Sequence, residues 1–158
     1  MEKKGFPPRV NKETEKLILG SLSGDESIKK QQYYGHPGND FWKLMGKAIK
    51  ENLAELEYEE RIQKLLEKKI GLWDVFASGL RQGSEDSKIK KEKLNNFTVL
   101  TESAPKIRKV FFNGKKAGAL ESFFKEKGFQ TKVLPSSSAL NRRNLKEREM
   151  EWKKIKEF

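Results

Sequence analysis

Short, dense apolar runs alternate along this chain with longer segments in which apolar residues recur every three or four positions. Runs of about 4–8 mostly apolar residues between polar turns are typical of buried strands. The pattern predicts strands at 16–20, 71–76, 109–112 and 131–134. It predicts helices at 41–53, 58–70 and 115–128, a charged terminal helix over about 140–158, and a loop with a short helix at 77–93.

Alternation of strands and helices predicts an α/β fold in which helices cover both faces of a parallel sheet. Ligands of such sheets bind outside the carboxyl ends of the strands. Unusual residues follow every predicted strand, so we expect four separate loops to converge on one edge. They are GSLSG (20–24) and YYGHPGND (33–40) after the first strand, Trp73–Asp74 at the end of the second, NGKK (113–116) after the third and PSSS (135–138) after the fourth.

Length and charge suggest one domain with a polyanionic partner. A chain of 158 residues is expected to form a single domain over 1–158. The formal net charge of +11 favours nucleic acid first and an anionic membrane surface second, and a merely lysine-rich protein is the alternative. Basic residues gather at 104–119 and 127–146 and glutamates at 51–60, which predicts a cationic rim and an acidic back rather than ordinary solvated helix faces.

The absence of certain residue types and segments excludes several classes of active site and of cellular location. The chain has no cysteine, which excludes disulfides, a cysteine nucleophile and thiolate metal sites. No apolar run approaches the roughly 18 residues of a membrane span, and the start MEKKGFPPRV lacks the apolar core of a signal peptide. We therefore expect a cytoplasmic protein that does not bind membranes.

Several classes of active site fit the motifs poorly. GSLSG lacks the lysine–serine ending of a P-loop and the spacing of a dinucleotide fingerprint. The only histidine, His36, with Asp25 and Glu26 is not a metal-ligand set, so neither a metal nor another cofactor is expected, and His36 is interpreted as a structural hydrogen bonder. A serine hydrolase lacks its nucleophile elbow, although the serines at 136–138 keep esterase chemistry open as an alternative.

Excision of a base from DNA fits the residues better. Such an enzyme takes the base out of the stack, at a cost of a few kcal/mol, and holds it in a pocket. Stacking on one aromatic ring, Tyr33 or Tyr34, returns roughly 1–3 kcal/mol. Breaking the glycosidic bond builds charge on sugar and base, which amides and hydroxyls at rigid strand ends can stabilise without a metal.

The motifs LILGSLSG, QQYYGHPGNDFW, GLWDVFASGLRQGSEDSKI, VFFNGKKA and LPSSS resemble the uracil-DNA glycosylase superfamily. The closest branch is that of the hypoxanthine-DNA (deoxyinosine) glycosylases. The resemblance runs from Gly5 to the start of the last helix. It implies a three-layer α/β/α fold with a short, mainly parallel four-stranded sheet.

The resemblance also implies residue roles. Tyr34 matches the aromatic that stacks on the flipped base, and Asn39 matches the asparagine on which catalysis depends in this branch. Asp74 lies where relatives carry a base-reading asparagine, and Asn113 is a second candidate to face the same pocket, although a simple turn is the alternative. The rest of the expected base pocket is Gly20, Ser21, Leu22 and His36.

The serine motif and its neighbours are expected to hold DNA. Arg81 and the RQGSEDS segment that follows from it are either phosphate contacts or a loop that satisfies its own polar groups. Helix N-termini favour anions, which makes the start of the last helix a phosphate candidate. The expected DNA-binding residues are Ser136, Ser137, Ser138, Asn141, Arg142, Arg143, Lys115 and Lys116.

The chain departs from its relatives at two places. Mismatch-specific relatives carry a catalytic asparagine where this chain has Leu22, which moves the catalytic weight to Asn39 and leaves the group that activates the water open. The branch often reads LPS-S/T-S-PAN, whereas this chain reads LPSSSALN. Leu140 is therefore either a wedge inserted into the duplex or a buried leucine of the first helical turn.

These observations predict a monofunctional DNA glycosylase that acts as a monomer. Its substrates are expected to be DNA with deaminated bases, hypoxanthine first, with uracil and xanthine as further candidates. No lysine is clearly placed for a Schiff base, so lyase chemistry is not expected. The alternative from another class is a non-catalytic DNA-binding or damage-sensing module with the same fold.

Overall fold

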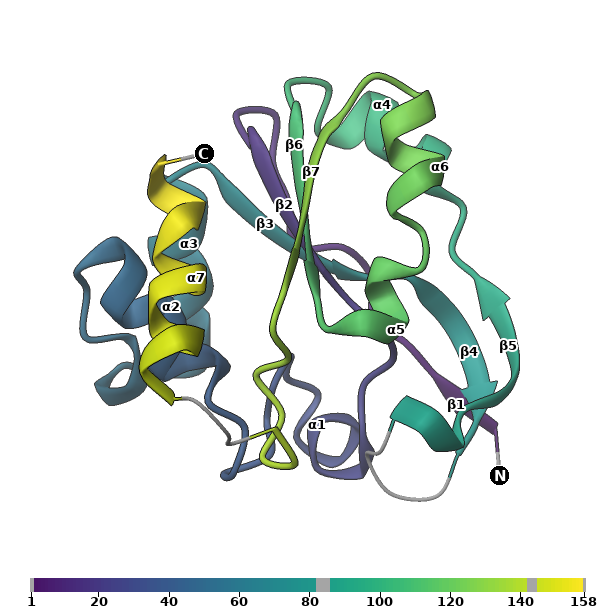
Figure 1. Cartoon of the computed structure of the whole chain (residues 1–158), viewed down its shortest axis with the longest axis horizontal. Coiled ribbons are helices and arrows are strands. Elements are labelled where there is room, and N and C mark those ends of the chain that lie inside the picture. The colour runs from purple at the N-terminus through teal and green to yellow at the C-terminus, as the bar shows by residue number, and fades with distance from the viewer. Residues whose placement is uncertain (1, 82–85, 142–144, 158) are drawn as a thin grey trace.

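A four-stranded, fully parallel sheet forms the centre of the computed structural model, which describes residues 2–81, 86–141 and 145–157 (Figure 1). The strand order is β3-β2-β6-β7, so the first strand of this sheet, β2, is an inner strand, and later strands are added on both sides of it. The predicted α/β sheet is confirmed. Its strands are β2 (Lys16–Gly20), β3 (Ile70–Asp74), β6 (Lys109–Asn113) and β7 (Gln130–Leu134).

Helices cover both faces of this sheet because alternate strand residues point to opposite sides. On β2, Ile18 belongs to one apolar cluster, and Leu17 and Leu19 belong to the other. The first cluster is covered by α2 (Phe41–Ile49), α3 (Tyr58–Glu67) and α7 (Leu145–Glu157). The second lies under α4 (Leu100–Ser103), α5 (Lys115–Gly118) and α6 (Glu121–Glu126).

A second, antiparallel sheet corrects the prediction of a loop over 77–93. Its strand order is β1-β4-β5, and β4 begins two residues after β3 ends. The predicted single strand 71–76 is therefore split between two sheets. The strands are β1 (Glu2–Lys4), β4 (Phe76–Leu80) and β5 (Lys90–Leu94).

The helices differ from the predicted ones in several places. α2 ends at Ile49 and α3 at Glu67, four and three residues before the predicted ends. The predicted helix at 115–128 is two short helices, α5 and α6. Within the described residues the terminal helix begins at Leu145, and residues 140 and 141, where it was expected to start, are not helical. A further helix, α1 (Asp25–Lys30), lies in the long loop after β2. The short 3-10 turns are η1 (Leu53–Glu55), η2 (Asp86–Lys88) and η3 (Phe97–Val99).

The carboxyl ends of the four parallel strands point toward one edge, at the bottom of Figure 1. The loop before α1, the loop before α2 and the loop after β7 all lie at this edge. The sheet therefore gathers the loops that the sequence singled out. In the part of the chain that the structure describes, no helix is long and apolar enough to cross a membrane.

Candidate active site

A cavity of about 630 Å³ opens at the carboxyl edge of the parallel sheet. Its volume lies in the range of pockets that hold small ligands. Loops after β2 and β7 and the segment before α2 form its walls, as the strand pattern predicted. Its lining is Gly20, Ser21, Leu22, Ser23, Gly24, Asp25, Glu26, Ser27, Tyr33, Tyr34, His36, Asn39, Asp74, Lys88, Ser138, Ala139 and Leu140.

The inner end of the cavity is built where β2 and β3 end side by side. Gly20 pairs with Asp74 in the sheet register. A Cβ atom on Gly20 would lie 2.8 Å from Asp74 Oδ1 and 2.9 Å from the Tyr34 hydroxyl. Only glycine therefore lets the carboxyl and the phenol approach each other at this point.

Asp74 is a buried carboxyl with an unusual ionisation. The residue is 3% exposed, and the Ser23 hydroxyl donates to Oδ2 at 3.3 Å. Burial raises the pKa of Asp74 to about 7, and the negative charge of Asp86 adds to the rise against the opposing effects of Ser23 and Arg81. Near neutral pH the group is therefore present both as a carboxylate and as a carboxylic acid. The acid form can donate a hydrogen bond as well as accept one.

Tyr34 presents an aromatic ring from a strained position. Its backbone has φ +56°, a left-handed conformation that non-glycine residues seldom adopt and that clusters at functional sites. The ring stacks on Phe41 with centroids 3.9 Å apart and planes inclined by 15°. Because Phe41 covers one face, only the other face remains for a ligand in the cavity. The hydroxyl is buried, and this burial, followed by the Asp74 charge, raises the pKa of Tyr34 far above its usual value.

Tyr33 belongs to the apolar core despite its position beside Tyr34. It is 2% exposed, and its hydroxyl donates to the Pro7 carbonyl at 2.9 Å. Phe6 meets its ring edge to face, with centroids 5.2 Å apart. The structure therefore favours Tyr34 over Tyr33 as the stacking ring.

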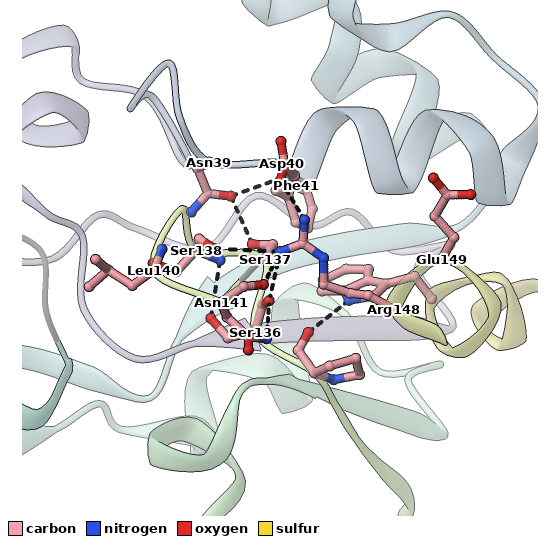
Figure 2. Close-up of polar contacts among 12 residues, drawn as sticks. Asn39, Asp40, Phe41, Ser136, Ser137, Ser138, Leu140, Asn141, Arg148 and Glu149 are labelled. Atoms are coloured by element: carbon pink, nitrogen blue, oxygen red, sulfur yellow. Dashed lines mark hydrogen bonds and ion pairs between the residues drawn. The ribbon is translucent and has the colours of Figure 1, made fainter. Parts of the chain in front are cut away.

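Asn39 turns the nitrogen of its side-chain amide toward the cavity. Its Oδ1 accepts hydrogen bonds from the Phe41 backbone amide at 2.9 Å and from the Ser137 hydroxyl at 2.8 Å (Figure 2). The Phe41 N–H can only donate, which identifies the atom facing it as oxygen. Within the described residues Nδ2 has no partner, so Asn39 offers the cavity a hydrogen-bond donor.

The serine loop, residues 136–138, lies against Asn39. Ser137 is fully buried, and its hydroxyl accepts a hydrogen bond from Asn113 Nδ2 at 2.9 Å while it donates to Asn39. Asn113 Oδ1 accepts from the Ser137 backbone amide, also at 2.9 Å. Asn113 is buried and is not among the residues that line the cavity, so its expected part in reading the base stays a prediction. The burial of Ser137 does not fit a phosphate contact.

Arg148 of α7, which the sequence analysis missed, holds the serine loop in place. Its guanidinium is buried and donates to the carbonyl oxygens of Asn141 at 2.8 Å, Ser136 at 3.2 Å and Ser138 at 3.4 Å (Figure 2). It also forms an ion pair with Asp40, the neighbour of Asn39. One sequence signal could have revealed it, since Arg148 shares a helical face with Trp152 and Ile155 (spacing i, i+4, i+7).

A second buried arginine supports the opposite wall. The Arg81 guanidinium donates to the backbone oxygens of Leu22 at 2.7 Å and Ser23 at 2.9 Å, and to Asp86 at 3.2 Å. Ser21 donates to the same Asp86 oxygen at 2.6 Å. Of the two interpretations of Arg81, the structure favours a loop that satisfies its own polar groups over a phosphate contact.

Other candidates lie at the rim or away from the cavity. His36 is exposed, and its Nδ1 accepts from the Gly38 backbone amide at 2.9 Å. Leu140 is 73% exposed at the cavity rim, so the alternative of a buried leucine is wrong. Lys116 pairs with Glu92 at 3.0 Å. Neither Lys116 nor Lys115 lines the cavity. Asn141 donates a hydrogen bond to the Ser136 carbonyl at 2.9 Å. The remaining candidates, Arg142, Arg143 and Ser84, lie outside the described residues.

The predicted cationic rim is only partly formed, because the basic residues lie before and after β6 and therefore at opposite edges of the sheet. Lys106, Arg108 and Lys109 lie before or at the start of β6, at the edge away from the cavity. Lys115 and Lys116 follow β6 and lie at the cavity edge. The basic cluster of the sequence is thus divided by the sheet.

An aromatic face, a buried carboxyl and an oriented amide in one cavity make a site for a single planar heterocycle in an α/β/α protein. The sequence profile of the uracil DNA glycosylase superfamily matches residues 7–158, and the chain belongs to that superfamily. The superfamily consists of enzymes that hydrolyse the bond between base and sugar. The prediction of a DNA glycosylase is confirmed at that level.

Similar proteins match over nearly the whole chain. A protein of Methanosarcina barkeri (strain Fusaro / DSM 804) named hypoxanthine DNA glycosylase is 54% identical over 152 residues, 96% of each chain. A protein of the same name from Methanosarcina acetivorans is 56% identical over 155 residues, 98% of each. The solution NMR structure of a candidate uracil DNA glycosylase from M. acetivorans has a TM-score of 0.90 at 55% identity, covering 98% of this chain and 96% of that one.

Proposed function

We propose that this DNA glycosylase removes hypoxanthine from DNA, with uracil and xanthine as further substrates, and leaves an abasic site. The name shared by the two relatives at 54% and 56% identity supports this substrate. The observation that carries the proposal is the meeting of Tyr34, Asp74 and Asn39 in one cavity. Together they supply a stacking face, a group that matches the base edge, and a donor for the departing base.

Asp74 suits the edge of a deaminated base. Hypoxanthine and uracil each present a ring N–H beside a carbonyl, whereas adenine has an acceptor in place of that N–H. Either ionisation state of a carboxyl accepts a hydrogen bond from the N–H, and the protonated state also donates to the carbonyl. Only the ionised form of Asp74 separates the deaminated base from its parent, because it repels the adenine ring nitrogen, whereas the protonated form can donate to that nitrogen.

Hydrolysis adds water at the sugar carbon C1′ and breaks the bond from C1′ to the base nitrogen. The bond electrons go to the base, which takes up a proton from solvent. The Asn39 Nδ2 donates to the base as negative charge builds on it. We assign Glu26, which lines the cavity, is partly exposed and has no partner within the described residues, to accept the proton that the water loses and to release it to solvent. Its neighbour Asp25 is paired with Lys3.

The exposed residues around the cavity supply the surface that meets DNA. Leu140 lies at the rim, with parts of Ser136, Ser138 and Asn141 beside it. Lys115 lies at the same edge of the sheet. The proposed chemistry needs no residue from a second chain, and we propose that the enzyme acts as a monomer.

An excision assay tests the proposal. A labelled duplex with one deoxyinosine is incubated with the protein and then treated with hot alkali, and the matched duplex carries deoxyadenosine at that position. We expect strand breaks only in the inosine duplex, a loss of about 100-fold or more in rate for Asn39→Ala, and a slower rate with unchanged duplex affinity for Glu26→Gln. Tight binding of the inosine duplex without alkali-labile sites would instead indicate a non-catalytic damage sensor.

A further inference from the structure

Three polar side chains from three different segments form a continuous hydrogen-bonded relay beneath the cavity. Asn113 ends β6, Ser137 lies in the serine loop and Asn39 precedes α2. Asn113 Nδ2 donates to Ser137 Oγ at 2.9 Å, and Ser137 Oγ donates to Asn39 Oδ1 at 2.8 Å. A hydroxyl has one hydrogen, so the donation from Asn113 leaves the Ser137 hydrogen for Asn39 alone.

This relay fixes the orientation of the Asn39 amide. Its oxygen receives the Ser137 hydroxyl and the Phe41 backbone N–H, at 2.8 Å and 2.9 Å. Turning the amide over would set Nδ2 against two donors and leave the Phe41 N–H unpaired. Donors on an amide oxygen also shift electron density away from its nitrogen, which makes the N–H groups of Asn39 stronger donors.

We propose that Ser137 is a positioning residue, which holds and polarises Asn39 rather than contacting a DNA phosphate. Ser137 is 0% exposed, and both hydrogen-bonding roles of its hydroxyl are filled inside the protein. Its carbonyl also accepts from the Asp40 backbone amide at 2.9 Å, which joins the serine loop to the segment that carries Asn39. The inference rests on the proposed role of Asn39 and adds the group that orients it.

Single-turnover excision from the deoxyinosine duplex, with duplex affinity measured in parallel, tests the relay. We expect Ser137→Ala to lower the excision rate about 10- to 100-fold while affinity stays within about twofold. The double variant with Asn39→Ala should excise as slowly as Asn39→Ala alone, because the serine acts only through that amide. Ser103→Ala on α4, which removes a hydroxyl bonded to the Val99 carbonyl at 3.0 Å, is the matched control and should retain the full rate.

Asn113→Asp tests the same relay without removing a side chain. An ionised carboxylate only accepts, so it diverts the Ser137 hydrogen away from Asn39. We expect excision to fall as pH rises and this carboxyl ionises, with affinity unchanged, even if Ser137→Ala does not fold.

Each failure of the test has a distinct meaning. Wild-type excision by Ser137→Ala beside an inactive Asn39→Ala would refute the relay and spare the proposed function. Weaker binding and a smaller salt dependence for Ser137→Ala would make Ser137 a phosphate contact after all. Full activity of Asn39→Ala would refute the role of Asn39 and this inference with it.

Discussion

Asp74 is an ionisable residue that the fold buries almost completely. Its side chain lies among buried groups at the end of β3, with the Ser23 hydroxyl as a hydrogen-bond donor to its carboxyl. Burial is the main cause that raises its pKa from 3.8 to about 7. In the unfolded chain water solvates the carboxylate, so the group ionises there at its ordinary pKa.

This difference makes the stability of the protein depend on pH. The folded state holds the Asp74 proton over a range in which the unfolded chain has lost it, so stability falls as pH rises from about 4 to about 7. Between about pH 5 and pH 8 the loss from this group is about 2–3 kcal/mol. Asp74→Asn, which is always neutral, should remove that part of the fall.

Urea unfolding of wild type and variant at both pH values measures the effect. Glu126→Gln is the control, because Glu126 is an exposed carboxylate on α6. Its stability should follow that of the wild type at every pH. If the Asp74→Asn protein lost stability with pH as steeply as the wild type, the pKa of Asp74 would not be raised in the folded protein.

Sequence alone placed residues at the cavity but did not define how each side chain is used. Tyr34, Asn39 and Asp74 could be expected there because they follow strands whose carboxyl ends share one edge. Asn113 and Ser137 occupy equivalent positions, yet they bond to each other instead of facing the cavity. That choice depends on loop conformation, which a pattern of apolar residues does not encode.

At the scale of elements, α7 contributes to the site through one buried charge. Its apolar face contacts the sheet through Trp152 and Ile155, and Arg148 occupies the next turn of that face. The guanidinium there meets three carbonyl oxygens of the loop that follows β7 and the Asp40 carboxylate. The last helix therefore fastens two loops of the cavity wall to each other.

Arg148→Met should lower the free energy of unfolding by about 3–5 kcal/mol, because it leaves the Asp40 charge without its buried partner. The adjacent pair of Lys47 and Glu149 joins α2 to α7 at 2.6 Å but lies at the surface, with side chains 56% and 35% exposed. Lys47→Met should therefore cost less than about 1 kcal/mol. Chemical denaturation compares the two variants, and equal losses would mean that Arg148 acts as an ordinary surface charge.

The antiparallel sheet shows where element prediction from sequence failed. β5 reads KKEKL, and all of its residues are exposed. A strand with no buried face has no alternation of apolar and polar residues, so nothing in its pattern separates it from a loop. Its pairing with β4 forms it instead. The parallel strands β2, β3 and β6 were predictable because they are buried on both faces and read as nearly continuous apolar runs, whereas β7 is a partly exposed edge strand that only its short TKVL run and the following proline revealed.

For the whole molecule, the arrangement of charge matters more than its total. The net charge of +11 favours polyanions in general. Pairing and topology decide which cations reach DNA at the cavity edge. Lys106 lies before β6, at the far edge, and pairs with Glu13 at 2.8 Å. Lys115 follows β6 beside Gly114, where a Cβ atom would lie 3.2 Å from the Ser136 Cβ.

These two lysines therefore give a direct test of which face binds the duplex. Each phosphate contact adds about one unit to the slope of log affinity against log salt concentration, because a counterion is released. Lys115→Gln should lower the slope for an undamaged duplex by about one unit, since Lys115 is exposed and has no partner within the described residues. Lys106→Gln removes the same charge from the far edge and should leave the slope unchanged. Fluorescence anisotropy across a salt series measures both, and equal slopes for the two variants would mean that duplex binding depends on total charge rather than on the cavity edge.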